Sequence, residues 1–238
     1  MMKERKEIFA TAKETAEAFG DYLMKEAGEK SVFHCALSGG STPKMLFDYL
    51  AVKYRDSPLW NGIHFYWGDE RCVSPEDAES NFKMTKERLL DYIPIPQENV
   101  HRVLGENDPE REAERYGQEL LEYLPTHKGL PVFDLIILGM GEDGHTASIF
   151  PHQMELLSSE EVCRVAVHPD SGQKRVTLTG PVINAAHEVV FLVTGAGKKE
   201  KVSEIFNKTG EWESYPAAHI GPEQGSLVWF LDEAAVGK

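Results

Sequence analysis

The chain has 238 residues, of which 41% are hydrophobic and 27% charged, an ordinary composition for a globular protein with a sizeable core. Its formal net charge of −14 disfavours nucleic acid and anionic membranes as partners, although an anionic small molecule senses only its local pocket. The three cysteines form no C-x-x-C pair, the N-terminus lacks the apolar run of a secretory signal, and no stretch is apolar enough to span a membrane, so we expect a cytoplasmic protein.

Apolar residues at helical spacing predict an amphipathic helix from Phe9 to about Gly28. Val32–Leu37 is then predicted as the first strand, and a helix follows it with Thr42 as the expected N-cap and Pro43 in its first turn. Further strands are predicted at 63–68, 133–138, 162–167, 176–179, 188–195 and 226–231. Further helices are predicted at 81–91 with Ser80 as the cap, at 109–124 where Asp108-Pro109 opens the helix, and at 181–187 and 196–206. Because strands alternate with helices without a linker, we predict a single α/β domain over residues 1–238, doubly wound around one mostly parallel sheet with helices on both faces.

A glycine-rich loop, SGGSTP, connects the first strand to its helix. Its glycines let the backbone approach a ligand, its hydroxyl groups can donate hydrogen bonds, and the following helix offers free N–H groups, which suits a phosphate or sugar hydroxyls. An ordinary strand-to-helix turn with a good cap is the alternative, and the spacing is not that of a P-loop. The candidate binding residues of this loop are Ser38, Gly39, Gly40, Ser41 and Thr42.

The stretch FDLIILGMGEDGHTASIFP, residues 133–151, is the most informative part of the chain. A buried strand runs directly into a glycine-lined loop that carries Asp143 and His145, at the position where open α/β sheets bind ligands. GMGEDG matches the dinucleotide fingerprint, but Pro151 follows too soon for the long helix which that fingerprint requires. The remaining alternative is a tight turn in which Asp143 caps a helix and His145 is a surface residue.

Charged side chains follow two other predicted strands and precede a third. Asp69 and Arg71 come after the strand at 63–68, where they could also form a solvated rim, and Arg175 precedes the strand at 176–179. Lys198 lies in the first turn of the helix after the strand at 188–195, where a cation opposes the helix dipole. That unfavourable position suggests that Lys198 serves a ligand.

Five segments of this chain together resemble the 6-phosphogluconolactonase family in order and spacing: LSGGSTPKMLF, WGDERCVSPEDAESNFKM, FDLIILGMGEDGHTASIFP, KRVTLTGPVINAA and FLVTGAGKKE. The sequence is more remotely similar to the glucosamine-6-phosphate deaminases, in which the histidine motif usually continues to A-F-N-E-P with a glutamate used in ring opening. Here the continuation is Ala147–Pro151, the lactonase form. The resemblance implies hydrolysis of 6-phosphoglucono-1,5-lactone to 6-phosphogluconate in the pentose phosphate pathway, with no metal and no organic cofactor.

The residues suit that reaction. A strained lactone needs a positioned base more than a covalent nucleophile, and histidine, with an ordinary pKa of about 6.5, can deprotonate water at neutral pH. We therefore assign His145 as the general base, with Asp143 or Glu142 orienting its ring. Backbone N–H groups such as that of Gly141, or the cation of Arg71, are candidates for the oxyanion. The phosphate candidates are Arg175, Lys198 and Lys174, while Asp69 and the 38–42 loop would bind sugar hydroxyls or hold Arg71 in place.

Other functions fit the sequence less well. There is no G-x-S-x-G elbow for a serine hydrolase and no H-E-x-x-H zinc motif, and His34 and His64 lie in predicted strands as core or sheet-face residues. A non-catalytic sugar-phosphate sensor of the same fold would not need the Asp143–His145 pair. We expect the partner to be a small sugar phosphate, and the protein to be a monomer or a weak homodimer.

Overall fold

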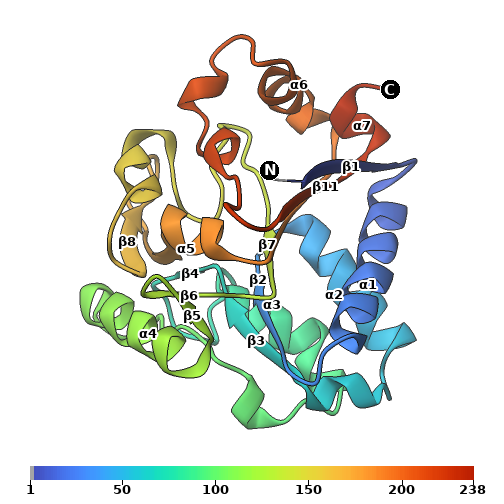
Figure 1. Ribbon diagram of the computed structural model, residues 1–238, viewed down its shortest axis with the longest axis vertical. Helices are drawn as coiled ribbons and strands as arrows, with labels where there is room; N and C mark the ends of the chain where they lie inside the picture. The colour runs from blue at the N-terminus through green and yellow to red at the C-terminus, as the bar shows by residue number, and fades with distance from the viewer. Residues whose placement is uncertain (1–2) are drawn as a thin grey trace.

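A computed structural model describes residues 3–238, and a six-stranded parallel sheet forms its centre (Figure 1). The strand order is β1-β11-β10-β7-β2-β3, and all neighbouring strands run parallel. These strands are β1 (Lys3–Phe9), β2 (Phe33–Leu37), β3 (Ile63–Trp67), β7 (Leu135–Leu138), β10 (Glu188–Val193) and β11 (Ser226–Asp232). Their loops leave the same edge of the sheet, so side chains from distant parts of the sequence can meet there.

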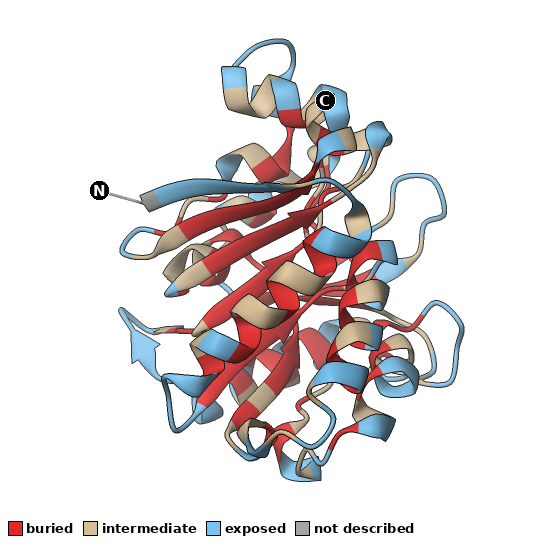
Figure 2. Ribbon diagram, turned by 90° about the vertical axis from the view of Figure 1, so that its right-hand side faces the viewer, coloured by how far each residue is buried: buried red, intermediate tan, exposed pale blue. Residues whose placement is uncertain are grey.

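Helices cover both faces of this sheet, as predicted. Helices α1 (Ala12–Gly28) and α2 (Ser41–Lys53) pack on one face, where Phe19 of α1 contacts Phe230 of β11. Helix α6 (Lys199–Asn207) packs on the other, where Phe206 contacts Trp229. Figure 2 shows the strands buried along most of their length, except the edge strand β1. The remaining helices are α3 (Asn81–Arg88), α4 (Pro109–Tyr123), α5 (Gly180–Ala185) and α7 (Glu233–Val236).

A second, three-stranded sheet lies beside the central one and is antiparallel throughout, with the order β4-β9-β8. Its strands are β4 (Asp69–Arg71), β8 (Cys163–Val167) and β9 (Lys174–Leu178). The prediction that the strands at 162–167 and 176–179 join the one central sheet is therefore wrong. They form a hairpin, closed by the turn at 168–173, that pairs with β4 instead of entering the parallel sheet. The strands β5 (Thr126–His127) and β6 (Leu130–Pro131), of two residues each, pair with each other as a short antiparallel hairpin.

The N-terminal prediction starts the first helix too early. Residues 3–9 form β1, and the helix begins at Ala12 after Thr11, whose hydroxyl accepts a hydrogen bond from the N–H of Glu14 at 3.1 Å. The strand reads KERKEIF and, within the described residues, pairs only with β11. The charged side chains of residues 4–7 lie at an exposed edge, so the sequence shows no apolar alternation there. By contrast, the predicted caps Ser80 of α3 and Asp108 of α4 are confirmed.

Within residues 3–238 no helix combines the length and the apolar character needed to cross a bilayer.

Three histidines lie against one another at the β3 edge of the central sheet. His34 and His64 are direct partners in the β2–β3 register, and Nδ1 of His64 lies 3.1 Å from Nε2 of His101. The expectation that His34 and His64 are core or sheet-face residues is confirmed, since His34 is buried and His64 is partly buried. Burial, together with the charges that His34 and His101 would carry, lowers the pKa of His64 to about 4.

We expect this cluster to make the fold sensitive to acid. A histidine in the unfolded chain titrates near 6.5, so the unfolded state takes up protons first as the pH falls from about 6.5 to about 4. The contribution of His64 to the free energy of unfolding should fall by about 2–3 kcal/mol across that window and change little above it. Urea unfolding of the wild type and His64→Gln at about pH 7.5 and about pH 4.5 measures this. Equal acid sensitivity in both proteins would assign the loss to other groups.

Candidate active site

Most of the predicted site residues meet at the C-terminal edge of the central sheet, where β2 and β7 lie side by side. From β2 the chain continues to β3 on one side, and from β7 it continues to β10 on the other, so this is the topological switch point at which open α/β sheets bind ligands. A polar cavity of about 180 Å³ opens there. It is lined by Ser38, Gly39, Gly40, Asp69, Arg71, Asn81, Gly139, Met140, Gly141, His145, Ala147 and Arg175.

His145 is held by the loop that leaves β7. Its Nδ1 lies 2.6 Å from Oδ1 of Asp143, and the same oxygen accepts the backbone N–H of His145 at 3.1 Å. Partial burial raises the pKa of Asp143, but the hydrogen bond and charge of His145 outweigh it and bring the pKa down to about 2. An ionised Asp143 fixes the proton of the ring on Nδ1, which leaves Nε2 as the basic nitrogen. The ring packs on Phe150, with centroids 4.7 Å apart.

Two glycines around the cavity admit no side chain. A Cβ at Gly141 would lie 2.2 Å from Nδ1 of His145, and one at Gly39 would lie 2.0 Å from Oδ1 of Asn81. The residues after GMGEDG form turns and an isolated bridge, and the next helical segment is the 3₁₀ helix η4 (Pro151–Leu157). Gly141 therefore leaves room for the Asp143–His145 pair, and the GMGEDG loop does not open a dinucleotide-binding helix.

Arg71 and Arg175 form a pair across the small sheet. They are direct partners in the antiparallel β4–β9 register, and both line the cavity. Burial and the like charge of Arg71 lower the pKa of Arg175, and Nε of Arg71 is buried without a hydrogen-bond partner among the described residues. Like charges directly opposite in a sheet cost about 0.2–1 kcal/mol, so this arrangement suits a site where an anion binds between the two guanidinium groups.

The acidic residues of the DER segment are buried, so the alternative of a solvated rim is wrong. Glu70 is 2% exposed, and its carboxylate accepts hydrogen bonds from the backbone N–H groups of Arg71, Asn81 and Phe82 and from the hydroxyl of Ser80. Burial raises the pKa of Glu70 despite these bonds. Glu70 thereby joins β4 to the start of α3, and this connection places Asn81 at the cavity.

Only the first three residues of the 38–42 loop line the cavity. Ser38, Gly39 and Gly40 line the cavity, whereas Ser41 is exposed and the hydroxyl of Thr42 lies 2.7 Å from that of Thr194. The prediction that Thr42 is the N-cap of α2 is wrong. The cap is Gly40, whose φ of 120° turns the chain into the helix two residues earlier.

Two of the predicted phosphate cations lie outside the cavity. Lys198 is the last residue of the 3₁₀ helix η5 (Ala196–Lys198), where burial lowers its pKa and the charges of Glu142 and Asp143 oppose that effect. It faces the loop that carries His145 but does not line the cavity. Lys174 is exposed, and alternation along β9 directs it away from the face that carries Arg175.

Sequence reasoning missed Asn81 and two buried hydroxyl residues beneath the cavity, Ser148 and Thr177. Asn81 follows a recognised helix cap, but its contact with Gly39 joins segments that are far apart in the chain. Ser148 lies inside the recognised motif, and nothing local marks its partners.

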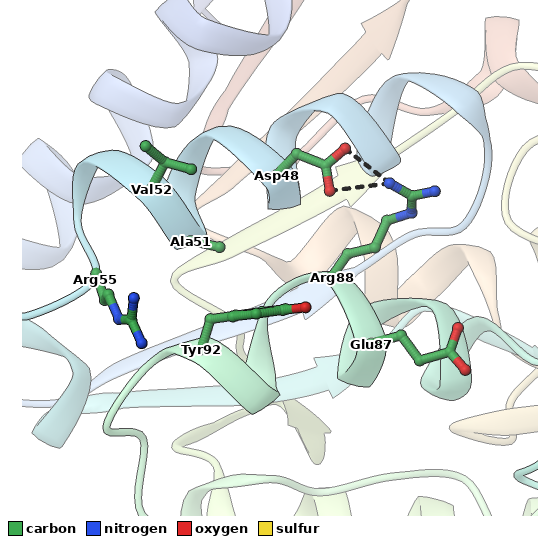
Figure 3. Close-up of a pocket in the computed structure, with 7 residues that line it drawn as sticks. All are labelled: Asp48, Ala51, Val52, Arg55, Glu87, Arg88 and Tyr92. Atoms are coloured by element: carbon green, nitrogen blue, oxygen red, sulfur yellow. Dashed lines mark hydrogen bonds and ion pairs between the residues drawn. The ribbon is translucent and has the colours of Figure 1, made fainter.

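A wider groove of about 760 Å³ lies between the second half of α2 and the end of α3 (Figure 3). Arg88 pairs there with Asp48 at 2.8 Å, and Tyr92 lies beside them. None of the predicted site residues lines this groove, and Arg88, one of its two arginines, already has a carboxylate partner. We therefore place the candidate site in the smaller cavity.

Comparisons with known proteins identify the family of this chain. The sequence model of a family described as glucosamine-6-phosphate isomerases/6-phosphogluconolactonase matches residues 7–229. The chain belongs to this family. It is 43% identical over 229 residues to the 6-phosphogluconolactonase of Haemophilus influenzae, and the alignment covers 96% of this chain and 97% of that protein.

Solved structures of related proteins match over almost the whole chain. The devB protein superposes with a TM-score of 0.95 at 45% identity, covering 98% of each chain. The 6-phosphogluconolactonase of Trypanosoma brucei superposes with a TM-score of 0.89 at 31% identity, covering 100% of this chain and 99% of that one. The resemblance seen in the sequence is thus confirmed at the level of the family, and the matched residues include all five of its motifs.

Proposed function

We propose that this member of the glucosamine-6-phosphate isomerase/6-phosphogluconolactonase family is a cytoplasmic hydrolase that converts 6-phosphoglucono-1,5-lactone to 6-phosphogluconate. The observation that carries the proposal is one cavity containing both a carboxylate-held histidine and a pair of opposed arginines. The histidine suits the activation of water, and the arginines suit a phosphate. The names of the full-length relatives agree with this activity.

In the proposed reaction, Nε2 of His145 takes a proton from a water molecule while the water oxygen attacks the lactone carbonyl carbon. The carbonyl oxygen becomes an oxyanion as the tetrahedral intermediate forms. The bond between this carbon and the ring oxygen then breaks, and the imidazolium returns its proton to the departing oxygen, which becomes a hydroxyl group of the product. Asp143 is ionised at neutral pH, so it would keep the ring oriented and stabilise the imidazolium.

The two ends of the substrate need different partners. Arg71 and Arg175 are direct partners in the β4–β9 register. We therefore assign both to the phosphate, and not one to each end of the substrate. The oxyanion is then left to backbone N–H groups of the loops around Gly39 and Gly141 and to the N-terminus of α2, where no side chain caps the helix. Asp69 is the candidate acceptor for sugar hydroxyls, and Lys198 would add positive charge beside the histidine loop.

The proposal includes no metal and no organic cofactor. Within the described residues no three His, Cys, Asp or Glu side chains are grouped as a metal site. We further propose that the protein is a monomer or a weak homodimer.

We expect the purified protein, after treatment with a chelator, to hydrolyse 6-phosphogluconolactone well above the spontaneous rate. The lactone would be generated in place by glucose-6-phosphate dehydrogenase, and its loss followed by proton release. Activity that disappears with the chelator and returns with zinc would overturn the cofactor-free mechanism. Release of ammonia from glucosamine 6-phosphate would instead assign the deaminase reaction, and absence of both activities would favour a sugar-phosphate sensor.

A further inference from the structure

Ser148 lies beneath the cavity in a tight turn that follows the histidine loop. Thr146 and Ile149 form a two-way backbone bridge, and Ala147 and Ser148 are the two residues between them. Ala147 has a φ of 48°, a left-handed conformation that alanine rarely adopts. Such a conformation persists where the surrounding structure enforces it, and such sites cluster around functional residues. The turn directs Ser148 away from solvent, and its exposed fraction is 0%.

The hydroxyl of Ser148 connects two charged side chains of the cavity. It donates a hydrogen bond to Oδ2 of Asp69 at 2.5 Å, and it accepts one from Nη1 of Arg175 at 3.5 Å. The backbone N–H of Ser148 donates to the hydroxyl of Thr177 at 3.2 Å, which fixes the turn on β9. Asp69 is 5% exposed and Arg175 is 9% exposed, so both charges lie where water screens them poorly.

A buried carboxylate and a buried guanidinium at close range ordinarily form a direct two-point ion pair. Here the short bond from Ser148 occupies Oδ2 of Asp69, and the hydroxyl oxygen lies between the carboxylate and Nη1 of Arg175. One face of the guanidinium also packs over the ring of Phe150, with Cζ 5.5 Å from the ring centroid. Nε of Arg175 donates to Oε1 of Gln173 at 3.3 Å, and the N–H groups that remain can be offered to an anion in the cavity.

From this geometry we propose that Ser148 is a positioning residue, which keeps Asp69 from neutralising Arg175 and so preserves a free guanidinium for the phosphate of the substrate. The proposal rests on the lactonase function proposed above. A purely structural role would weaken binding of both lactones. The positioning role instead predicts a rise in KM that depends on the charge of Asp69 and on the phosphate of the substrate.

The test is a double-mutant cycle of Ser148→Ala and Asp69→Asn, with KM measured for the phosphorylated lactone and for glucono-1,5-lactone. We expect Ser148→Ala to raise KM for the phosphorylated lactone about ten-fold, since Arg175 turns to Asp69, and to leave KM for the unphosphorylated lactone nearly unchanged. Adding Asp69→Asn should reverse most of the change in the ratio of the two KM values, because a neutral amide cannot capture the guanidinium. The loss of Asp69 as an acceptor for sugar hydroxyls affects both lactones and therefore cancels in that ratio. Ser148→Thr retains the hydroxyl and should keep the KM ratio of the wild type.

Thr15→Val is the matched control, because the hydroxyl of Thr15 is equally buried but bonds to backbone carbonyls of Thr11 and Leu231. It should leave the KM ratio of the two lactones unchanged even if it lowers stability. An equal rise in KM for both lactones in Ser148→Ala would overturn the proposal. So would a change in the KM ratio that Asp69→Asn does not reverse. A wild-type protein without lactonase activity would instead refute the proposed function, so the two failures are distinct.

Discussion

Replacing His145 by asparagine is expected to lower kcat for the phosphorylated lactone by about 10²–10⁴-fold, with the lower end favoured because the lactone is already activated. Asparagine retains a polar side chain next to Asp143 but cannot accept a proton from water. The fold and KM should change little, since the ring is only partly buried and makes its hydrogen bond within its own loop. Stopped assays with the spontaneous hydrolysis subtracted measure the loss.

The pH profile separates a base from a structural histidine. The wild-type rate should fall on acidification as the imidazole becomes protonated, and this acid limb should be missing in His145→Asn. Asp143→Asn should give a smaller loss, because it misorients the ring without removing it. Near-normal kcat in His145→Asn would move the base elsewhere, with Asp69 the next candidate in the cavity.

Replacing Arg175 or Arg71 by alanine is expected to raise KM for the phosphorylated lactone about ten- to a hundred-fold, the effect of one charge-assisted hydrogen bond of about 1.5–3 kcal/mol. KM for glucono-1,5-lactone, which has no phosphate, should change far less. Because the two arginines face each other across β4 and β9, we expect the double variant to lose less than the product of the single losses. Steady-state kinetics of the wild type, the two single variants and the double variant, each with both lactones, measure these KM changes.

Lys174→Ala is the matched control for this pair. Lys174 precedes Arg175 on the same strand but is exposed on the opposite face, so its removal should leave both KM values unchanged. Lys198→Ala tests the remaining cation and should have a smaller effect than either arginine, since Lys198 does not line the cavity. Equal losses on both lactones in the arginine variants would assign these residues to the carbonyl or to the structure of the site.

Local signals predicted much of this fold. The apolar runs at β2, β7 and β10 and the caps Ser80 and Asp108 depend on neighbours within a few residues, which a sequence displays directly. The strand-to-loop change at Gly139 predicted where the histidine loop lies, because the ends of parallel strands always share one edge of the sheet.

The parts that could not be predicted are those that depend on pairing between distant segments. Three charged residues of β4 gave no apolar alternation, so the strand and its register with β9 were not detectable. That register is what brings Arg71 opposite Arg175. Edge strand β1 escaped notice for a similar reason, since its charged residues pair with a strand more than two hundred residues later.

The two sheets divide the site between them, with His145 on a loop of the parallel sheet and both arginines on the antiparallel one. Among the described residues, the side chains at 71 and 175 make no hydrogen bond to the backbone that holds the histidine, so they can change without altering it. This separation predicts that the anion preference of such an enzyme can diverge while its water-activating chemistry is inherited intact. Substitutions selected for a new sugar acid would then fall first on the β8–β9 hairpin, while the histidine loop of the parallel sheet would retain the original reaction.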